Sequence, residues 1–428
     1  MSTSVTSRIR RLPAFWAVAL LVVLPFVLSA CGADPTATPT TAAATPTPTE
    51  AGPSAPAATP TPEPTPTPDA AALFQVEWDA LIAAAQAEGQ LTIAAGGAPS
   101  REYRGVVQQF EDTFGVTTVM STGSGSDTIN RVLAERQAGQ FLVDVGLISI
   151  ITSDTRLIPG NVLEPIAQYF IHPDVTDESL WFGGRHWYGD AGEERIFIYS
   201  AGLDDTHPIF YNTNLMSAEE VGAITSIPDM LDDRWKGRYV GLIPDASAGL
   251  AGLQSAWIDP DMGPDFVRKY LLEMDVTFTG DRRVLVDWLA MGAYPLVAFT
   301  GGVARDLRAL EGFGAPVKEV FIPRDTPGLS AGGSGNPIEM FTQAPHPNAA
   351  KLFLNWWLSR EGQTFIHENV EDLQRQSLRT DIPIGNVDET ERRAEGAEYT
   401  FQDADPAGQP LKDEALIEIA KIWLEARP

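Results

Sequence analysis

Between residues 73 and 148, segments with the apolar spacing of a helix alternate with short runs that are typical of a strand. The pattern predicts helices at 73–88, 99–114 and around 126–135, and strands at 91–95, 116–120 and 141–148. Consecutive strands joined by a helix form right-handed βαβ units, which build a parallel sheet. The alternation therefore constrains the chain to an α/β fold with doubly wound sheets.

The same two patterns continue through the rest of the 428 residues. Strands are expected at 208–212, 239–243 and 294–299, and helices at 264–273, 282–291, 348–358 and 413–427. A chain of this length exceeds the usual size of one domain, so we expect two or more lobes.

Charge and cysteine content exclude several classes of protein. The formal net charge of -27 argues against sequence-independent nucleic-acid binding, which requires clustered Lys and Arg. The single cysteine, Cys31, excludes an internal disulfide and a multi-cysteine metal site. None of the five histidines has a helical spacing that pairs two metal ligands. We therefore expect no metal site, no cofactor and no partner nucleic acid.

The first residues have the pattern of a secretory signal. Arg8, Arg10 and Arg11 precede a short apolar run, which ends in Leu28-Ser-Ala-Cys31. Small residues before the lone cysteine resemble the lipobox of bacterial lipoproteins, in which cleavage occurs before the cysteine and lipid is attached to it. This predicts a signal peptide at 1–30 and lipidation of Cys31, and the alternative is a signal anchor with an incidental cysteine.

Residues 31–71 consist almost entirely of Thr, Pro and Ala after the cysteine. Such a composition lacks the large apolar side chains that offset the entropy cost of ordering, so we expect a disordered, polyproline-like tether. A lipid at one end and a globular part at the other would hold the protein near a membrane while leaving it able to turn.

Two glycine-containing motifs allow a functional and a plain interpretation. Gly123-Ser-Gly-Ser126 precedes a predicted helix, whose N-terminus is suited to a carboxylate or phosphate, although Ser126 is equally a plain helix cap. Gly328-Leu-Ser330-Ala-Gly332 matches the nucleophile motif of hydrolases, but prolines before it and glycines after it do not suit the required strand and helix. A hydrolase is therefore the weaker interpretation, and we expect no enzyme.

An aromatic cluster at 181–188 contains Trp181, His186, Trp187 and Tyr188 within a glycine-rich segment. These rings are suited to stacking on a ligand, and they are equally suited to covering the edge of a sheet.

The order of several short motifs resembles one known family, the ferric-iron-type extracellular solute-binding proteins of ABC importers. This family has the type 2 periplasmic-binding-protein fold. The resemblance extends over about 86–363 and rests on the segments Glu88–Ala95, Phe110–Val116, Gly123–Gly125, Arg131–Glu135, Ala138–Val145, Tyr211–Leu215, Leu231–Gly237, Ala344–Ala350 and Leu358–Gln363.

The resemblance implies two α/β lobes joined by hinge strands that close on a solute. On that pattern lobe one comprises 72–200 with 315–365, and lobe two comprises 205–310 with 366–428. Tyr211 and Asn212 would lie at or near a hinge strand. The ligand would lie outside the carboxyl ends of the strands, where parallel sheets generally bind ligands.

One departure from the family bears on the ligand. Ferric members carry adjacent tyrosines after the strand that corresponds to 294–299, because Fe³⁺ favours phenolate oxygens. Here that position is Thr300-Gly301, and no two tyrosines are adjacent in the chain. A small organic anion or a metal chelate is therefore expected rather than bare iron. The expected ligand contacts are Gly96, Gly97, Ser124, Gly125, Ser126, Asp245, Ser247, Arg282, Thr300 and Gly301, with Arg282 or Arg283 pairing with a carboxylate.

These observations predict a lipid-anchored, extracytoplasmic, monomeric receptor that delivers a small-molecule solute to an ABC permease in the membrane. The alternatives are direct binding of ferric iron, or a sensor or adaptor of the same fold that binds a partner protein and transports nothing.

Overall fold

The computed structural model describes residues 69–426 except 97–98, 122–124, 191, 205–208, 245–246, 300–302, 321, 323–327, 332–336, 372, 374, 402–403 and 406–407. The expected signal peptide, Cys31 and nearly all of the expected tether lie outside these residues. Among the described helices, none combines the length and the apolar character needed to cross a bilayer.

The first sheet combines three parallel strands with a later strand that runs in the opposite direction. Its order is β2-β1-β3-β13-β4, and β5 also pairs with β13. The βαβ pattern of the sequence is confirmed for β2, β1 and β3, which are parallel. The strands are β1 (Gln90–Ala95), β2 (Thr117–Met120), β3 (Val145–Leu147), β4 (Leu163–Glu164), β5 (Ile196–Ile198) and β13 (Pro337–Phe341).

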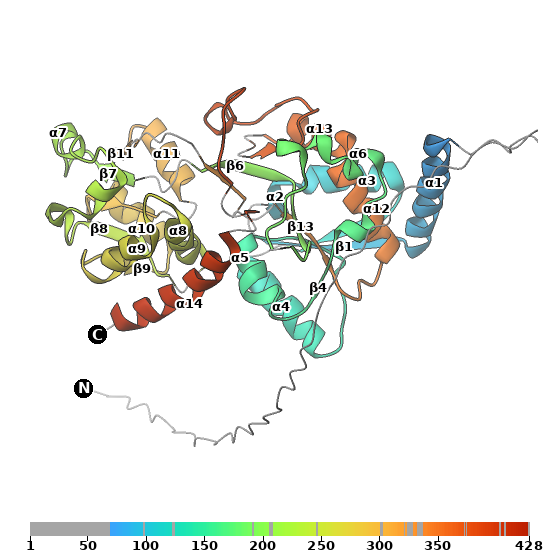
Figure 1. Ribbon diagram of the computed structural model, residues 1–428, viewed down its shortest axis with the longest axis horizontal. Helices are drawn as coiled ribbons and strands as arrows, with labels where there is room; N and C mark the ends of the chain where they lie inside the picture. The colour runs from blue at the N-terminus through green and yellow to red at the C-terminus, as the bar shows by residue number, and fades with distance from the viewer. Residues whose placement is uncertain are drawn as a thin grey trace, which may run out of the picture. The chain divides into compact units, whose positions relative to one another are not determined.

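Helices cover this sheet and bury one large hydrophobic core with it (Figure 1). The first helix, α1, begins at Asp69, whose side chain accepts a hydrogen bond from Ala71 N, and ends at Gly89 in a left-handed conformation. Glu88 at its last turn accepts hydrogen bonds from Asn348 N and Ala349 N, which fixes α1 against a helix far along the chain. The helices are α1 (Ala70–Glu88), α2 (Pro99–Glu102), α3 (Arg104–Phe114), α4 (Gly125–Gln137), α5 (Ile150–Thr152), α6 (Pro173–Thr176), α12 (Pro347–Leu358) and α13 (Arg360–Asn369).

The second sheet has the order β11-β7-β10-β8-β9 and its own buried residues. Strands β8, β9 and β10 are parallel, whereas β7 is antiparallel to β10 and to β11. Its strands are β7 (Ile209–Asn212), β8 (Tyr239–Leu242), β9 (Thr277–Thr279), β10 (Leu296–Val297) and β11 (Val317–Val320). Its helices are α7 (Ala218–Val221), α8 (Ser247–Ile258), α9 (Gly263–Leu272), α10 (Arg282–Ala290), α11 (Ala304–Gly312) and α14 (Gln409–Ala426).

A small third sheet lies where the chain passes between the two cores. It has the order β12-β6-β14, with β6 (Ser200–Asp204) antiparallel to β12 (Gly328–Ser330) and to β14 (Gln376–Ser377). Strand β6 leads from β5 of the first sheet to β7 of the second, and β12 leads back from β11 to β13. We call this three-stranded sheet the crossover sheet.

The last helix provides a further link between the cores. Ala415, Ile419 and Ile422 of α14 are buried in the second core. At the start of the same helix, the buried ammonium of Lys412 donates a hydrogen bond to Gly189 O at 3.1 Å and lies 3.9 Å from an oxygen of Asp154. Gly189 and Asp154 belong to the part of the chain that surrounds the first core, so α14 is held by both cores (Figure 1).

The buried residues divide the chain differently from the lobes expected from the sequence. Strand β11, expected in lobe one, pairs with β7 of the second sheet. Of the segment 366–428, expected in lobe two, Ile366, Leu378 and Phe401 are buried in the first core, and only α14 packs in the second. The physical reason is that the chain returns through β12, and its buried residues belong to the first core as far as Ala404.

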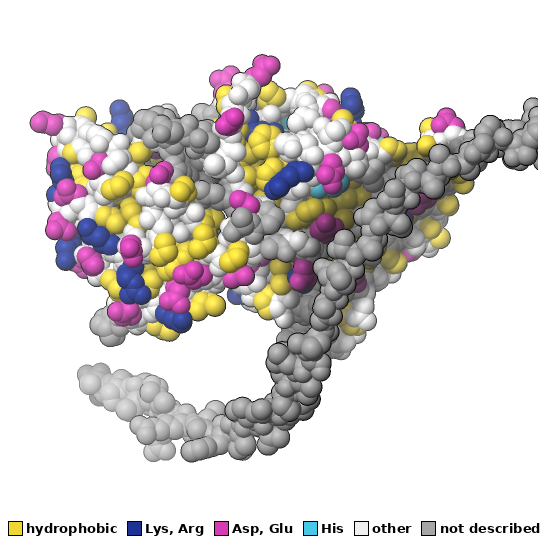
Figure 2. Space-filling model, in the orientation of Figure 1, with side chains coloured by type: hydrophobic (Ala, Val, Ile, Leu, Met, Phe, Trp, Pro, Cys, Tyr) yellow, Lys and Arg dark blue, Asp and Glu magenta, His cyan; other side chains and the backbone are white. Residues whose placement is uncertain are grey.

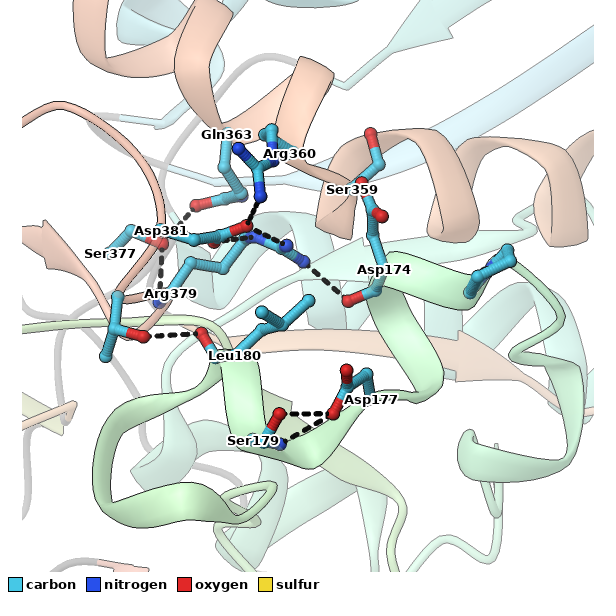
Figure 3. A network of polar contacts seen from close by, with 12 residues as sticks. Asp174, Asp177, Ser179, Leu180, Ser359, Arg360, Gln363, Ser377, Arg379 and Asp381 are labelled. Carbon is cyan, nitrogen blue, oxygen red and sulfur yellow. Dashed lines mark hydrogen bonds and ion pairs between the residues drawn. The ribbon is translucent and has the colours of Figure 1, made fainter.

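A buried arginine holds part of this returning segment in place (Figure 3). The Arg379 guanidinium donates to both carboxylate oxygens of Asp381, at 3.0 and 2.9 Å, and to Asp174 O at 2.7 Å. It also lies 5.3 Å from the ring centroid of Trp181. These contacts join the segment after α13 to α6 and to the aromatic cluster of the first core.

Some elements are shorter than their apolar patterns suggest. The expected strand at 141–148 forms only β3, and Leu142 is exposed. The expected strand at 294–299 forms only β10, and the expected helix at 99–114 is divided into α2 and α3 at Tyr103. In the two strands, fewer residues form paired backbone hydrogen bonds than the apolar pattern suggests.

Candidate functional site

The first group of expected contacts lies at one edge of the first sheet. Since β2, β1 and β3 are parallel, their carboxyl ends meet at the same edge. Gly96 is buried and directly follows β1, and Gly125 and Ser126 are the first residues of α4, the helix after β2. A helix N-terminus presents backbone N–H groups without intrahelical partners, which suits an anionic group.

The second group lies at the corresponding edge of the second sheet. Strands β9, β8 and β10 are adjacent and parallel, so their carboxyl ends also meet. Ser247 begins α8 after β8, and Arg282 begins α10 after β9. The first turn of α8 lies so close to the end of β8 that a Cβ at Gly249 would clash with Ile243 O. Only glycine fits there, and this close approach fixes where α8 begins.

The N-terminus of α10 differs from an open anion site. Asp281 caps the helix with its own carboxylate, which accepts hydrogen bonds from Arg283 N at 2.8 Å and Val284 N at 3.4 Å. Arg282 has a substantially exposed side chain, yet desolvation by the surrounding protein lowers its pKa, and the charge of Asp306 in α11 raises it. The guanidinium, rather than the helix end, is therefore the group at this position that suits an anion.

The crossover sheet connects these two edges. Strand β5 is parallel to β3 because both are antiparallel to β13, so β6 leaves the first sheet at its carboxyl edge. Strand β7 is antiparallel to β10, so its first residue, Ile209, lies at the carboxyl edge of the second sheet. The return path from β11 through β12 to β13 joins the same two edges. Both groups of expected contacts thus lie where the chain passes between the cores.

The two residues expected near a hinge lie in β7, the strand that follows β6. Asn212 is fully buried, donates to Leu289 O at 2.7 Å and accepts from Asn214 N at 2.9 Å. Tyr211 pairs with Leu296 of β10 and Lys318 of β11. These contacts attach the strand after β6 firmly to the second core.

An ion pair links the crossover sheet to the second core. Arg308 of α11 holds Glu319 of β11 with two contacts of 2.8 Å, and its Nη1 lies 3.8 Å from Glu391 Oε1. The other oxygen of Glu391 accepts a hydrogen bond from Leu203 N of β6 at 3.3 Å. A movement of the two cores about β6 would therefore change the contact between Arg308 and Glu391.

Six residues expected in the site lie outside the described residues. They are Cys31, Gly97, Ser124, Asp245, Thr300 and Gly301. For Gly125, Ser126 and Ser247 the backbone is described as the start of a helix, and nothing further is concluded about their side chains.

Ser330 of the hydrolase-like motif lies in β12 and is in register with Gly202 of β6. The next described element after it is strand β13, not the helix that a nucleophile motif requires. Ser330 is therefore part of the connection between the cores.

The histidines that are described have structural partners. His346 donates through its backbone N to Asp144 at 2.7 Å, and its Nδ1 lies 2.9 Å from the other oxygen of this buried carboxylate. His367 is buried between Gln363 O and Ser377 N, and burial lowers its pKa to about 4. Across the described residues, no group of three or more His, Cys, Asp or Glu side chains is placed to hold a metal ion.

The aromatic cluster is divided between burial and exposure. Trp181 is buried and packs edge-to-face on Phe197 and His186. Trp187 donates a hydrogen bond from its indole to Phe182 O and lies under the guanidinium of Arg185 at 3.8 Å. The covering role expected for these rings therefore fits Trp181, whereas His186 and Tyr188 border a pocket.

Sequence patterns missed a buried group of charged residues near α14. Glu339 of β13 is fully buried, accepts a hydrogen bond from Ser153 Oγ and has its pKa raised to about 8, mainly by burial. Asp154 and Lys412 lie in the same part of the fold and are nearly inaccessible. The one indication in the sequence is the position of Glu339 inside the apolar run Pro337–Phe341.

The charge on the exterior is mixed. Figure 2 shows Lys and Arg side chains singly or in small groups among Asp and Glu over the described part of the face in view.

Comparisons with solved structures support the fold. The periplasmic binding protein P5PA matches with a TM-score of 0.54 at 18% identity, covering 79% of this chain and 100% of its own. A ferric binding protein from Campylobacter jejuni matches with a TM-score of 0.54 at 16% identity, covering 79% and 99%. The IdiA (FutA) protein of Trichodesmium, in complex with iron and citrate, matches with a TM-score of 0.52 at 14% identity, covering 78% and 99%. The fold is thus the two-lobed type 2 periplasmic-binding-protein fold.

No curated protein sequence matches the chain. The family model of the bacterial extracellular solute-binding proteins matches residues 105–373, which is more than half of the sequence. This match agrees with the motif order, with the two sheets and with the crossover strands that join their carboxyl edges. The chain therefore belongs to the family of bacterial extracellular solute-binding proteins.

Proposed function

We propose that the protein is the receptor of an ABC importer and captures a small organic anion or a metal chelate. The observation that carries the proposal is the connection of the two carboxyl edges by β6 and β12. Helices α4 and α8 begin at these edges, and Arg282 lies at one of them. In this arrangement a solute would contact both edges and would favour the closed state by binding it more tightly.

The remaining contacts of the solute would come from residues near the same strand ends. Gly96, Gly125, Ser126 and Ser247 are the described members of this set, and Gly97, Ser124, Asp245, Thr300 and Gly301 complete it. Backbone N–H groups at the starts of α4 and α8 would bind oxygens of the solute, and Arg282 would pair with its charge. No catalytic step is needed for this role.

The N-terminal segment would place the receptor at the membrane. A lipid on Cys31 and a tether at 31–71 would keep the folded part close to its permease on the extracytoplasmic side. The tether would reach the folded part at α1, which Glu88 attaches to α12 in the first core. We propose that the receptor acts as a monomer.

The proposal is tested by melting the purified chain in the presence of candidate solutes. The panel contains citrate, ferric citrate, free ferric iron, dicarboxylates and phosphonates. A solute at a hundred times its Kd stabilises the folded state by about 2.7 kcal/mol, so the melting temperature should rise by a few degrees. A shift with bare ferric iron alone would contradict an organic anion or chelate. No shift with any solute would favour a sensor or adaptor that binds a partner protein.

Replacing Arg282 with methionine should weaken binding of the anion identified in this way by at least about tenfold. The physical reason is the loss of one charge-assisted hydrogen bond, which contributes about 1.5–3 kcal/mol. Calorimetric titration measures the change, and Arg268→Met is the matched control because Arg268 pairs with Glu425 on the second core. Equal Kd values for wild type and Arg282→Met would exclude the contact.

Replacing Arg308 with methionine should alter how far the two cores separate in the absence of solute. The substitution removes the contact of 3.8 Å to Glu391 and also the two contacts of 2.8 Å to Glu319. Both ion pairs are partly exposed, so the free energy of unfolding should change by only about 2 kcal/mol or less. Small-angle X-ray scattering measures the change as a larger radius of gyration than in Arg268→Met. An unchanged radius would mean that the ion pair does not restrain the hinge.

A further inference from the structure

A pocket of about 390 Å³ lies beside the amino-terminal end of β5. Gly192 and Glu194 line it and come just before this strand, whereas the solute contacts proposed above lie beyond the carboxyl ends of the strands. Phe170 lies at its inner side, shortly after β4, which pairs with the late residues of β13. The pocket is therefore a different place in the fold from the proposed solute site.

Aromatic rings form one wall of the pocket. Phe170, His186 and Tyr188 line it, and the centroid of His186 is 5.8 Å from Phe170 and 6.5 Å from Tyr188. The Nε2 atom of His186 is hydrogen-bonded to Val175 O at 2.8 Å, and burial lowers the pKa of the imidazole. Burial therefore disfavours the positively charged form of the imidazole.

Carboxylates also line the pocket, and one of them lies beside the aromatic wall, since Glu178 Oε1 is 3.7 Å from His186 Nδ1. Glu178, Asp190, Glu194 and Asp405 line the pocket. Asp190 is held by Arg195 at 3.2 Å, while Glu178 and Glu194 are exposed to the solvent. The pKa of Tyr188 is raised, first by burial and then by the charges of Glu194, Glu178 and Asp190, so these carboxylates lie near its hydroxyl.

Among the described lining residues, four carboxylates outnumber one arginine, Arg185. Arg185 lies with its guanidinium 3.8 Å from the ring centroid of Trp187, which is not part of the lining. An aromatic wall attracts cations through the negative face of each ring, and carboxylates attract them by charge. A metal ion suits the pocket less well, since the described residues place no three ligating side chains together.

We propose that this pocket binds a small organic ammonium ion. The ammonium group would lie between the rings of His186 and Tyr188 and the carboxylates of Glu178 and Glu194. Asp405 and Gln409 close the pocket from the segment that leads into α14. A bound cation would therefore add a contact between the first core and the helix that Lys412 attaches to both cores.

The test uses choline and its uncharged isostere 3,3-dimethyl-1-butanol with the purified full chain. Calorimetric titration should detect choline and should show at least about tenfold weaker binding of the isostere, because the two differ in charge and hardly in shape. The double variant Glu178→Gln/Glu194→Gln should weaken choline binding by about tenfold, and Tyr188→Leu by a similar factor. Tyr188→Phe keeps the ring and should retain most of the affinity.

Control variants distinguish choline bound in this pocket from choline bound elsewhere on the protein. Glu395→Gln removes an equally exposed carboxylate that does not line the pocket and should leave the Kd unchanged. Equal binding of choline and its isostere, or no choline binding in the millimolar range, would overturn the proposal. So would choline binding that survives the double variant but is lost in Ser126→Trp, because the cation would then occupy the solute site. If none of the candidate solutes in the melting experiment binds, the choline titrations still test the pocket.

Discussion

A variant in which Arg379 is replaced by methionine is expected to lose about 3 kcal/mol of its free energy of unfolding, because the substitution removes one partner of a buried ion pair. The guanidinium is fully buried and makes two hydrogen bonds to Asp381 and one each to Asp174 O and Leu358 O. Methionine fills much of the volume but leaves these acceptors without their donor. Urea unfolding followed by circular dichroism measures the loss.

The chain offers a matched control on the same carboxylate. Arg360 also contacts Asp381, at 2.7 Å, but its side chain is 57% exposed, so water replaces much of the contact when it is lost. Arg360→Met should therefore cost less than about 1 kcal/mol. If the two variants lost equal stability, the burial of Arg379 would not be the cause. Figure 3 shows both arginines on either side of Asp381.

The second large effect concerns Glu339, whose replacement by glutamine should stabilise the protein at alkaline pH. Glu339 is fully buried, and only one of its oxygens has a hydrogen-bond donor, Ser153 Oγ. Burial raises its pKa from 4.5 to about 8, and the charges of Asp190 and Asp154 add to the increase. Arg195 pairs with Asp190, and Lys412 lies beside Asp154. The pKa of Glu339 is raised even though these two cations are nearby.

The sign of the pH dependence follows from proton binding. Between about pH 4.5 and 8 the folded protein keeps the proton of Glu339 while the unfolded chain has lost it. Stability therefore falls as the pH rises through this range, and the loss is complete above the pKa of the folded state. Glutamine resembles the protonated form at every pH, so its advantage at pH 9 should be on the order of 4 kcal/mol and should vanish near pH 4.

Urea unfolding of wild type and Glu339→Gln at pH 5, 7 and 9 measures this difference. The control variant is Glu395→Gln, whose exposed carboxylate should leave the pH dependence unchanged. Parallel stability curves for wild type and Glu339→Gln would mean that the buried carboxyl is ionised in the folded protein. A smaller but pH-dependent gain would mean that Ser153 and the nearby Lys412 offset part of the penalty that burial imposes on its charge.

The motifs that resemble the family have mostly structural roles in the described residues. Asp144 accepts hydrogen bonds from Thr92 N and His346 N and so joins β1 to the start of α12. Asn212 fixes the end of α10 against β7. Motifs of this kind allow a fold to be identified from sequence because they maintain particular contacts between its strands and helices. For the same reason they do not determine the ligand.

Local pattern predicts the helices better than the strands. It predicts the last helix from 413, and this helix begins at Gln409; the helix predicted at 282–291 ends one residue earlier. Strand order cannot be predicted in this way, because β13 inserts beside β3 from a position almost 190 residues later in the chain. Its pairing depends on the crossover sheet, which the sequence shows only as a glycine-rich motif around Ser330.

The sequence by itself determined the α/β class, the expectation of two sheets and the family, because periodicity and motif order are properties of neighbouring residues. It also supplied the expected signal peptide, from the order of residues before Cys31, and the expected tether, from composition. Only the tertiary structure decided that 366–404 belong with the first core, that α14 is held by both cores through Lys412, and that Glu339 is buried. It also placed His186 and Tyr188 of the aromatic cluster in a pocket lined by carboxylates. Each of these depends on contacts between residues far apart in the chain, and no local spacing encodes them.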